Sequence, residues 1–264
     1  MDSQQLPIDF TRVAEFFQST HQQYVTADPF PHAAFSNLFD AQYLRQVARE
    51  FPQANDMAGS FTGEIEGGKY TESDFSRLGP ATQAFVAAAN SGTFCSLLTE
   101  LTGIPGLISD PYLSGGGLHQ TARGGRLKVH SDFNVHPSLN LTRQLNMIVY
   151  LNDDWDESWG GGLELWNEQM TKAEVVIQPH LGNVAIFTCS DISFHGLPDP
   201  ISCPPDRFRR SLAFYYFTAD GRTPEPRSTL WKERPGEDFM SRPSARFRRA
   251  GGQALQAAKT LIGR

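Results

Sequence analysis

The chain has 264 residues, of which 39% are hydrophobic and 11% aromatic, and its formal net charge is −6. This length permits one or two domains with a sizeable core, so the composition excludes a wholly disordered chain. The acidic balance argues against a general nucleic-acid binder, and no apolar run approaches the roughly 20 residues of a membrane-spanning helix. The first residues lack the basic start and apolar stretch of a secretory signal, so we expect no signal peptide.

The three cysteines, Cys95, Cys189 and Cys203, are odd in number and form no CxxC pair. Such a set argues against a disulfide framework and against a cysteine metal site. We therefore expect a cytoplasmic protein with no membrane or nucleic-acid partner. The sequence leaves its oligomeric state and its substrate partner open.

Helical patterns dominate the first hundred residues. Apolar side chains recur at helical spacing in residues 9–24, and again after Asp40, which is a candidate N-cap. A third helix is expected over residues 80–101 and should end at Gly103. Residues 59–79 are rich in Gly, Ser and Thr, which indicates a long loop or a hairpin.

From about residue 115 the pattern changes to short β-type runs separated by Gly, Asp, Asn and Pro. The expected strands are residues 127–130, 145–151, 163–166, 174–178, 184–188 and 211–218. Helices followed by strands predict an α+β fold, in which the helices cover one face of an antiparallel sheet. We therefore expect one domain over residues 1–222, with N-terminal helices in 1–105 buttressing a jelly-roll core in about 106–222.

The end of the chain differs in charge from the rest. Residues 221–264 carry ten basic and four acidic residues, in contrast to the acidic body. We expect residues 223–264 to form a basic, partly helical extension, with a helix over 244–262 that is interrupted at its two glycines. A basic segment of this kind is usually a solvated surface helix, and an anionic partner is the alternative.

The clearest chemical motif is His130-Ser131-Asp132. In an extended strand, residues two apart point to the same side, so the imidazole and the carboxylate project together. A second histidine, His195, follows another apolar strand. Two histidines and one carboxylate form the facial set that binds Fe(II) and leaves positions open for substrate and oxygen. These ligand types also suit Zn or Mn, and an isolated HxD is more often a structural hydrogen-bonded pair.

Arg209 and Ser211 open the last expected strand. Alternation along the strand puts both on one face, where a guanidinium and a hydroxyl suit a carboxylate bound by two hydrogen bonds. A surface basic cluster is the structural alternative. A long, proline-containing connection precedes this strand and leaves Arg207 and Arg210 as further candidates for the anchor. The serine two positions on favours Arg209.

The order of these motifs is similar to that of a known family. The stretch from Leu127 to Phe217, about a third of the chain, resembles the Fe(II)/2-oxoglutarate-dependent dioxygenases, most closely their prolyl-hydroxylase-like branch. The segments that carry the resemblance are VHSD (129–132), VYLNDDW (149–155), GGGL (160–163), FHG (194–196) and RRSLAFYYF (209–217). The resemblance implies a double-stranded β-helix, which is a jelly roll.

The resemblance also implies a metal site. It implies that His130, Asp132 and His195 are the catalytic residues that bind Fe(II), and that 2-oxoglutarate and O2 are the cosubstrates. An aspartate at the carboxylate position argues against a halogenase, in which a small residue leaves room for halide.

The cosubstrate residues follow from the same resemblance. It implies that Arg209 pairs with the distal carboxylate of 2-oxoglutarate. Tyr150 matches the tyrosine that hydrogen-bonds this carboxylate in prolyl hydroxylases, and Ser211 is a second candidate. Asn146 is expected to line the cosubstrate pocket. His119 lies on the strand before the HxD motif, where lining the substrate pocket is one interpretation and a polar strand residue is the favoured one.

The implied activity is hydroxylation of an unactivated C–H bond, with release of succinate and CO2. The branch favours a prolyl residue in a protein, or a proline-like amino acid, as the substrate. An oxygenase that tailors a small natural product, by hydroxylation or by another outcome such as desaturation, is one alternative. A non-catalytic, metal-binding jelly-roll protein is the other.

Overall fold

The computed structural model describes residues 6–219 and 225–237 of the chain. The described residues as far as Lys232 belong to one compact unit, which contains the helices, the sheet and the candidate site. The helix expected over residues 244–262 lies outside the described residues. No described helix has the length and apolar character needed to cross a membrane.

The first two helices begin at capping aspartates. Asp9 precedes α1 (Phe10–Val25), and Asp40 precedes α2 (Ala41–Arg49). The Asp40 carboxylate accepts the backbone N–H of Tyr43 at 2.7 Å, which satisfies one of the donors left free at a helix start. The expectation of both helices, and of Asp40 as an N-cap, is confirmed.

Two helices, α3 (Pro80–Ala89) and α4 (Gly92–Thr102), take the place of the single helix expected over residues 80–101. The prediction is wrong in the middle, because the Ser91 side chain accepts a backbone N–H from the first turn of α4 and caps a new helix. The predicted end is right, since Gly103 closes α4 in the left-handed conformation with φ 74°.

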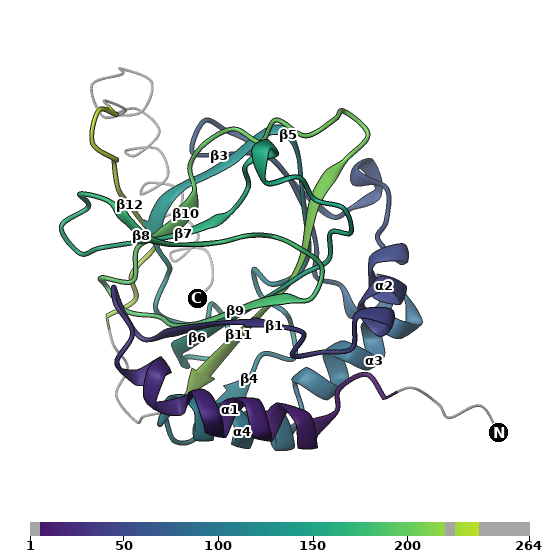
Figure 1. The fold of residues 1–264 in the computed structure, drawn as a ribbon, viewed down its shortest axis with the longest axis vertical. Coiled ribbons are helices and arrows are strands. Elements are labelled where there is room, and N and C mark those ends of the chain that lie inside the picture. Colours follow the sequence, from purple (N-terminus) through teal and green to yellow (C-terminus); the bar gives the residue numbers. More distant parts are fainter. Residues whose placement is uncertain (1–5, 220–224, 238–264) are drawn as a thin grey trace, which may run out of the picture. The chain divides into compact units, whose positions relative to one another are not determined.

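Twelve strands form one antiparallel sheet that curves into a nearly closed barrel (Figure 1). Along its main path the order is β1-β9-β6-β11-β5-β10-β7-β8. The bounds are β1 His32–Ser36, β9 Asn183–Thr188, β6 Thr142–Tyr150, β11 Phe208–Thr218, β5 Gly117–Ser131, β10 His195–Leu197, β7 Leu163–Trp166 and β8 Ala173–Ile177. The expected α+β fold with a jelly-roll core is therefore confirmed.

Four short strands lie off this path. They are β2 (Gly59–Thr62), β3 (Glu66–Glu72), β4 (Ile108–Ser109) and β12 (Leu230–Trp231). β2 and β3 form a hairpin within the segment expected as a loop or hairpin, and β3 pairs with β5. β12 also pairs with β5, so the chain contacts the sheet eight residues beyond position 222, where the sequence placed the end of the domain. β1, which the sequence did not reveal, adds a strand from the N-terminal part.

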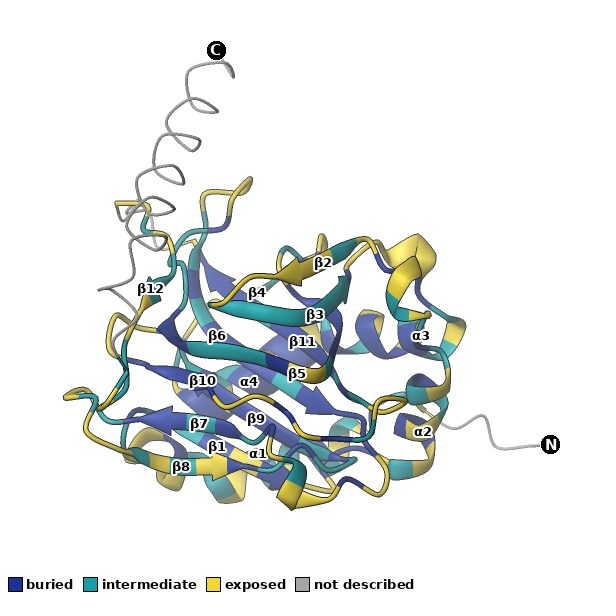
Figure 2. Ribbon diagram, turned by 90° about the horizontal axis from the view of Figure 1, so that it is seen from above, coloured by how far each residue is buried: buried dark blue, intermediate teal, exposed yellow. Residues whose placement is uncertain are grey.

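One face of β6 and β11 packs into the hydrophobic core, and the other face lines the interior of the barrel. On β6, Leu145, Met147 and Val149 face outward into the hydrophobic core shared with the helices. Asn146 and Ile148, from the alternate positions, line a cavity inside the barrel. The helices α1 and α4 cover the outer face of this half of the barrel, and Figure 2 shows its strands deeply buried. The helices therefore hold the sheet that positions the interior side chains.

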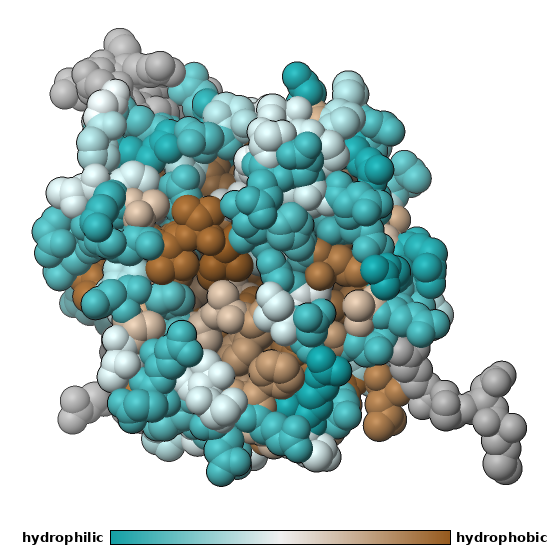
Figure 3. Space-filling view, viewed as in Figure 1, coloured by the Kyte–Doolittle hydropathy of each residue, from teal (hydrophilic) through white to brown (hydrophobic). Residues whose placement is uncertain are grey.

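Burial is uneven around the barrel. Figure 2 shows β2 and much of β8 at the surface, whereas β6, β10 and β11 are buried almost throughout. On the face seen in Figure 3, hydrophobic side chains are visible mainly in the middle, with hydrophilic side chains around them. The three buried strands carry Tyr150, His195 and Arg209, which the sequence singled out.

Candidate functional site

Three side chains with metal-binding atoms meet inside the barrel. His130 lies near the end of β5, Asp132 follows β5, and His195 begins β10. Antiparallel pairing sets His195 opposite His130. One potential ligand atom from each residue lies within 4.8 Å of the others, and the described residues contain no second group of this kind. The fold thus brings together the three residues that the sequence singled out for a metal.

Backbone carbonyls orient both imidazoles. Nδ1 of His130 lies 2.8 Å from the carbonyl of Lys128, and Nδ1 of His195 lies 3.0 Å from that of Ser193. A carbonyl only accepts hydrogen bonds, so each Nδ1 carries the proton and each Nε2 presents a lone pair. Nε2 of His130 lies 3.3 Å from Asp132 Oδ1, so the lone pairs and the carboxylate converge on one point. Metal-binding histidines are fixed in this way.

Burial and neighbouring charges set the protonation of His195 and Asp132. Burial, and after it the adjacent His130, lowers the pKa of His195 to about 4. Burial alone would raise the pKa of Asp132, but the Arg143 cation and the two imidazoles outweigh it and hold that pKa well below its usual range. Near neutral pH the set is therefore a neutral imidazole beside a carboxylate, as a divalent cation requires.

Arg209 and Tyr150 meet in the same cavity, away from the metal-binding atoms. Both side chains are buried, and the guanidinium carbon of Arg209 lies 5.0 Å from the centre of the Tyr150 ring. The Tyr150 hydroxyl has no hydrogen-bond partner among the described residues. Burial lowers the pKa of Arg209, and the neighbouring Tyr150 opposes this shift. A buried cation beside a free hydroxyl can bind a carboxylate.

Gly161 allows Arg209 to occupy this position. The Arg209 Nε donates to the Gly161 carbonyl at 2.5 Å, and a Cβ on Gly161 would lie 3.1 Å from the Arg209 side chain. Gly161 also has φ 81°, a conformation that side chains with a Cβ rarely adopt. The glycine run that the resemblance included therefore holds the arginine in place.

The other two arginines considered for this role point elsewhere. Arg210 faces outward, where its guanidinium lies over the Phe51 ring and donates to the Ala48 carbonyl. Arg207 is exposed in the preceding turn. Ser211 lies on the cavity side of β11 and pairs with Tyr150 of β6. Strand alternation thus agrees with the choice of Arg209 and Ser211.

Asn146 lies at the metal end of the cavity. Its amide nitrogen donates to Asp132 Oδ2 at 2.8 Å, and its oxygen accepts from Arg143. The side chain faces the interior as expected, but its amide nitrogen bonds a proposed metal ligand.

No motif in the sequence indicated Arg143. This residue is buried and forms an ion pair with Asp132, with Nη2 3.0 Å from Oδ2. Strict alternation from Asn146 would turn Arg143 away from the cavity. A β-bulge between β6 and β11 shifts the register here and turns the side chain inward, which no motif in the sequence signalled.

Two further cavity residues were missed or undervalued. His119 was interpreted as a polar strand residue, yet it is buried against the cavity and its Nε2 has no partner among the described residues. Trp231 of β12 lines the mouth and lies over His130, with ring centres 4.9 Å apart. A signal for Trp231 was absent because β12 has only two residues.

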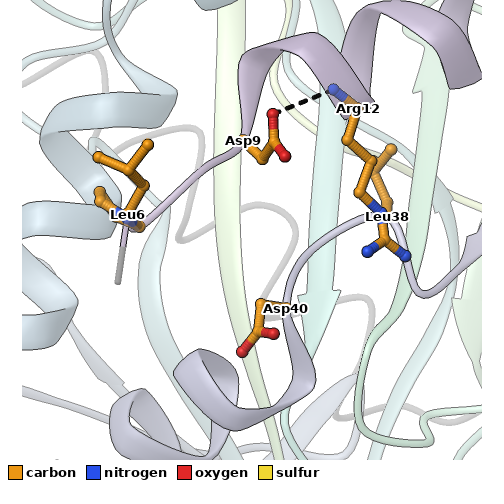
Figure 4. Close-up of a pocket in the computed structure, with 6 residues that line it drawn as sticks. Leu6, Asp9, Arg12, Leu38 and Asp40 are labelled. Atoms are coloured by element: carbon orange, nitrogen blue, oxygen red, sulfur yellow. Dashed lines mark hydrogen bonds between the residues drawn. The ribbon is translucent and has the colours of Figure 1, made fainter. Parts of the chain in front are cut away.

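The cavity that joins these groups has a volume of about 160 Å³ and is lined by residues of β3, β5, β6, β10 and β11. A larger hollow of about 260 Å³ lies on the surface between the start of α1 and the start of α2 (Figure 4). It is lined by Asp9, Arg12 and Asp40, and the first and last of these cap helices. The barrel cavity, although smaller, is the one that holds the chemical groups.

Comparison with protein families gives one match. Residues 116–217 match the family described as the 2OG-Fe(II) oxygenase superfamily. This range contains the HxD motif, the second histidine and Arg209. No curated protein sequence matches the chain.

Several solved structures have a similar fold. A prolyl-4-hydroxylase from Pseudomonas putida has a TM-score of 0.53 and 17% identity, over 76% of this chain and 98% of that one. Prolyl 4-hydroxylases from Phytophthora capsici give a TM-score of 0.56 and 19% identity, over 82% and 68%. A prolyl hydroxylase from Trichoplax adhaerens, in complex with a peptide fragment of hypoxia inducible factor, gives 0.53 and 15%, over 79% and 90%.

Proposed function

We propose that this 2-oxoglutarate-dependent dioxygenase, whose residues 116–217 match the 2OG-Fe(II) oxygenase superfamily, hydroxylates a prolyl residue in a protein or a proline-like amino acid. The reaction attacks an unactivated C–H bond and releases succinate and CO2. One observation carries the proposal: a His-Asp-His set whose two histidines are buried and a buried Arg209–Tyr150 pair share one cavity.

At the metal end, we propose that His130, Asp132 and His195 hold Fe(II). The two histidines are buried away from bulk water, and the lowered pKa values of Asp132 and His195 leave a carboxylate and a neutral imidazole, which suit a divalent cation. Three protein ligands leave positions open on a six-coordinate ion. When bound together, Fe(II) and 2-oxoglutarate supply the activation of O2 that breaks the C–H bond.

At the other end, we propose that Arg209 binds the distal carboxylate of 2-oxoglutarate. Its guanidinium supplies paired donors, and the unpartnered Tyr150 hydroxyl supplies one more. Ser211, next to Tyr150 across the strands, is a further donor. These groups fix the cosubstrate at the end opposite the metal, so its keto acid end faces the His-Asp-His set.

The mouth of the cavity supports the proposed substrate class. Phe133 and Tyr215 lie at the metal end of the cavity on one side, and Trp231 lies over His130. Aromatic walls favour a compact apolar ring such as pyrrolidine. The three prolyl hydroxylases share the architecture of this chain, at 15–19% identity, so a barrel of this kind is able to carry prolyl hydroxylation.

The proposal is tested first by an anaerobic titration with Fe(II) and 2-oxoglutarate, which should give a visible charge-transfer band that needs both. The band should be lost in His130→Ala. Succinate formation is then measured with proline-containing peptides, with free L-proline and with the same peptides in which alanine replaces proline. Stimulation by prolyl peptides or free proline alone supports the proposal. A band without such stimulation would overturn the substrate class and favour a natural-product oxygenase, and no band in folded protein would favour a non-catalytic role.

A further inference from the structure

Arg143 is a buried cation bonded to a proposed metal ligand. Its Nη2 lies 3.0 Å from Asp132 Oδ2, and its Nε and Nη2 donate to Asn146 Oδ1 at 3.1 and 2.6 Å. The amide nitrogen of Asn146 donates to the same Asp132 oxygen at 2.8 Å. Arg143, Asn146 and Asp132 therefore form a closed triangle of hydrogen bonds.

Two aromatic rings hold the guanidinium in this position. The guanidinium carbon of Arg143 lies 3.5 Å from the centre of the Tyr215 ring and 4.4 Å from that of Phe133. One nitrogen, Nη1, is buried without a hydrogen-bond partner among the described residues. A buried cation with an unsatisfied donor costs stability. The arrangement fixes the guanidinium at the expense of stability.

The two donors act on only one of the two carboxylate oxygens. Each oxygen lies beside one imidazole, Oδ1 3.3 Å from His130 Nε2 and Oδ2 3.5 Å from His195 Nε2. Only Oδ2 accepts hydrogen bonds from Arg143 and Asn146. An oxygen that already accepts two hydrogen bonds is a poor ligand for a cation, because its lone pairs are engaged and Arg143 repels positive charge. Oδ1 remains available for a metal.

We propose that Arg143 is a positioning residue that keeps Asp132 a one-oxygen metal ligand. The inference rests on the proposed function, since it concerns the same metal site. A six-coordinate ion bound through one atom of each of three residues keeps three positions open, and a second carboxylate oxygen would take one of them. Arg143 thereby preserves the positions that cosubstrate and oxygen need.

The test uses Mn(II) alone as the probe and counts its bound waters by water-proton relaxation. The variant is Arg143→Gln, because a glutamine amide ends where the arginine Nε lies. It can still bond Asn146, but it cannot reach Asp132. We expect the water count to fall from three to two, which lowers the relaxation enhancement by about one third. Because a cation is removed and an oxygen is added, Mn(II) should bind at least as tightly as in the unchanged protein.

The matched control is Arg209→Gln, the same change at the opposite end of the cavity, which should leave the water count at three. Arg143→Lys restores a cation near Asp132 and should restore three waters. If Arg143→Gln does not fold, Arg143→Met serves in its place, with the same expectation.

Two results would overturn the inference. Three waters in folded Arg143→Gln would show that Asp132 does not depend on Arg143. Weaker Mn(II) binding with an unchanged water count would indicate a structural role only. A failure of the proposed function is a separate outcome, because it is measured in the unchanged protein by the Fe(II) and 2-oxoglutarate titration and by succinate formation, and neither measurement enters the water count.

Discussion

The two ends of the cavity differ in how a buried charge is neutralised. At the metal end, the Asp132 carboxylate is neutralised by Arg143, and the pair is closed by Asn146. At the other end, Arg209 is buried with a carbonyl and the Tyr150 ring as neighbours, and burial lowers its pKa. The first end is electrostatically complete within the protein. The second end has no such counter-ion among the described residues, and we expect the carboxylate of the cosubstrate to supply it.

Asp132→Asn should have the largest effect of the changes considered, because it lowers both the stability of the protein and its affinity for metal. The change removes the anion and leaves the Arg143 cation buried and unpaired, so the free energy of unfolding should fall by about 3–5 kcal/mol. The affinity for Fe(II) or Mn(II) should fall by about 100-fold or more. Denaturant unfolding and anaerobic metal titration measure the two effects.

The control for this change is Asp191→Asn. Asp191 forms an ion pair with Arg227 at 2.8 Å, but its side chain is 75% exposed. An exposed pair contributes little, so the unfolding free energy should change by no more than about 1 kcal/mol. Equal losses in the two variants would contradict the view that Asp132 and Arg143 depend on each other.

Arg209→Met should weaken the binding of 2-oxoglutarate without this loss of stability. The variant removes a buried cation that has no anionic partner, so the unfolding free energy without cosubstrate should stay within about 1 kcal/mol of the unchanged protein. The affinity for 2-oxoglutarate should fall by about 100-fold, as expected when one side of a buried charged contact is lost. Metal binding should persist.

Arg209→Met is measured by titration of 2-oxoglutarate into metal-loaded protein and by denaturation of the metal-free protein. The assignment of Arg209 as the anchor fails if 2-oxoglutarate binds with unchanged affinity. The comparison of the two ends fails if the variant loses as much stability as Asp132→Asn.

Gly161→Ala should have a smaller effect than Arg209→Met on the affinity for 2-oxoglutarate. The added Cβ lies 3.1 Å from the Arg209 side chain and forces it to move, so 2-oxoglutarate should bind more weakly. The backbone conformation, with φ 81°, adds about 1–2 kcal/mol of destabilisation. Gly160→Ala is the matched control, because its φ is 74° and nothing lies within 4 Å of the added atom. It should lose stability but keep its affinity for 2-oxoglutarate.

Strand alternation predicted much of this site from the sequence. His130 and Asp132 are two apart, as are Arg209 and Ser211, and each pair lies on one side of its strand, in the cavity. Their meeting with His195 follows from antiparallel pairing, which the motif order of a known family indicated. The prediction succeeded where the local rule of alternation holds.

The rule fails at Arg143 because a bulge shifts the register of β6, and a bulge depends on pairing with another strand. β12 and Trp231 were not predicted either, and the reason is again pairing with another strand. A two-residue strand has no pattern of its own, and its position depends on the edge of β5 that receives it. The residues that the sequence did not reveal are therefore those that tertiary contacts turn toward the site.

The last prediction concerns pH and the buried His119. Burial, followed by the Lys69 cation, holds the pKa of His119 well below its ordinary value of 6.5. The folded protein thus keeps this imidazole neutral, whereas the unfolded chain takes up a proton near pH 6.5. The stabilising contribution is fully present above pH 6.5 and is lost as the pH falls below it.

His119→Gln should make the stability of the metal-free protein less dependent on pH. Between pH 7 and 5.5 the unchanged protein should lose about 1 kcal/mol more of its unfolding free energy than the variant. His195, whose pKa is lowered to about 4, acts in the same direction, so the variant keeps part of the slope. Denaturant unfolding across this pH range measures both curves. Parallel curves would mean that His119 is protonated equally in the folded and unfolded chains, which its position between Lys69 and Arg209 opposes.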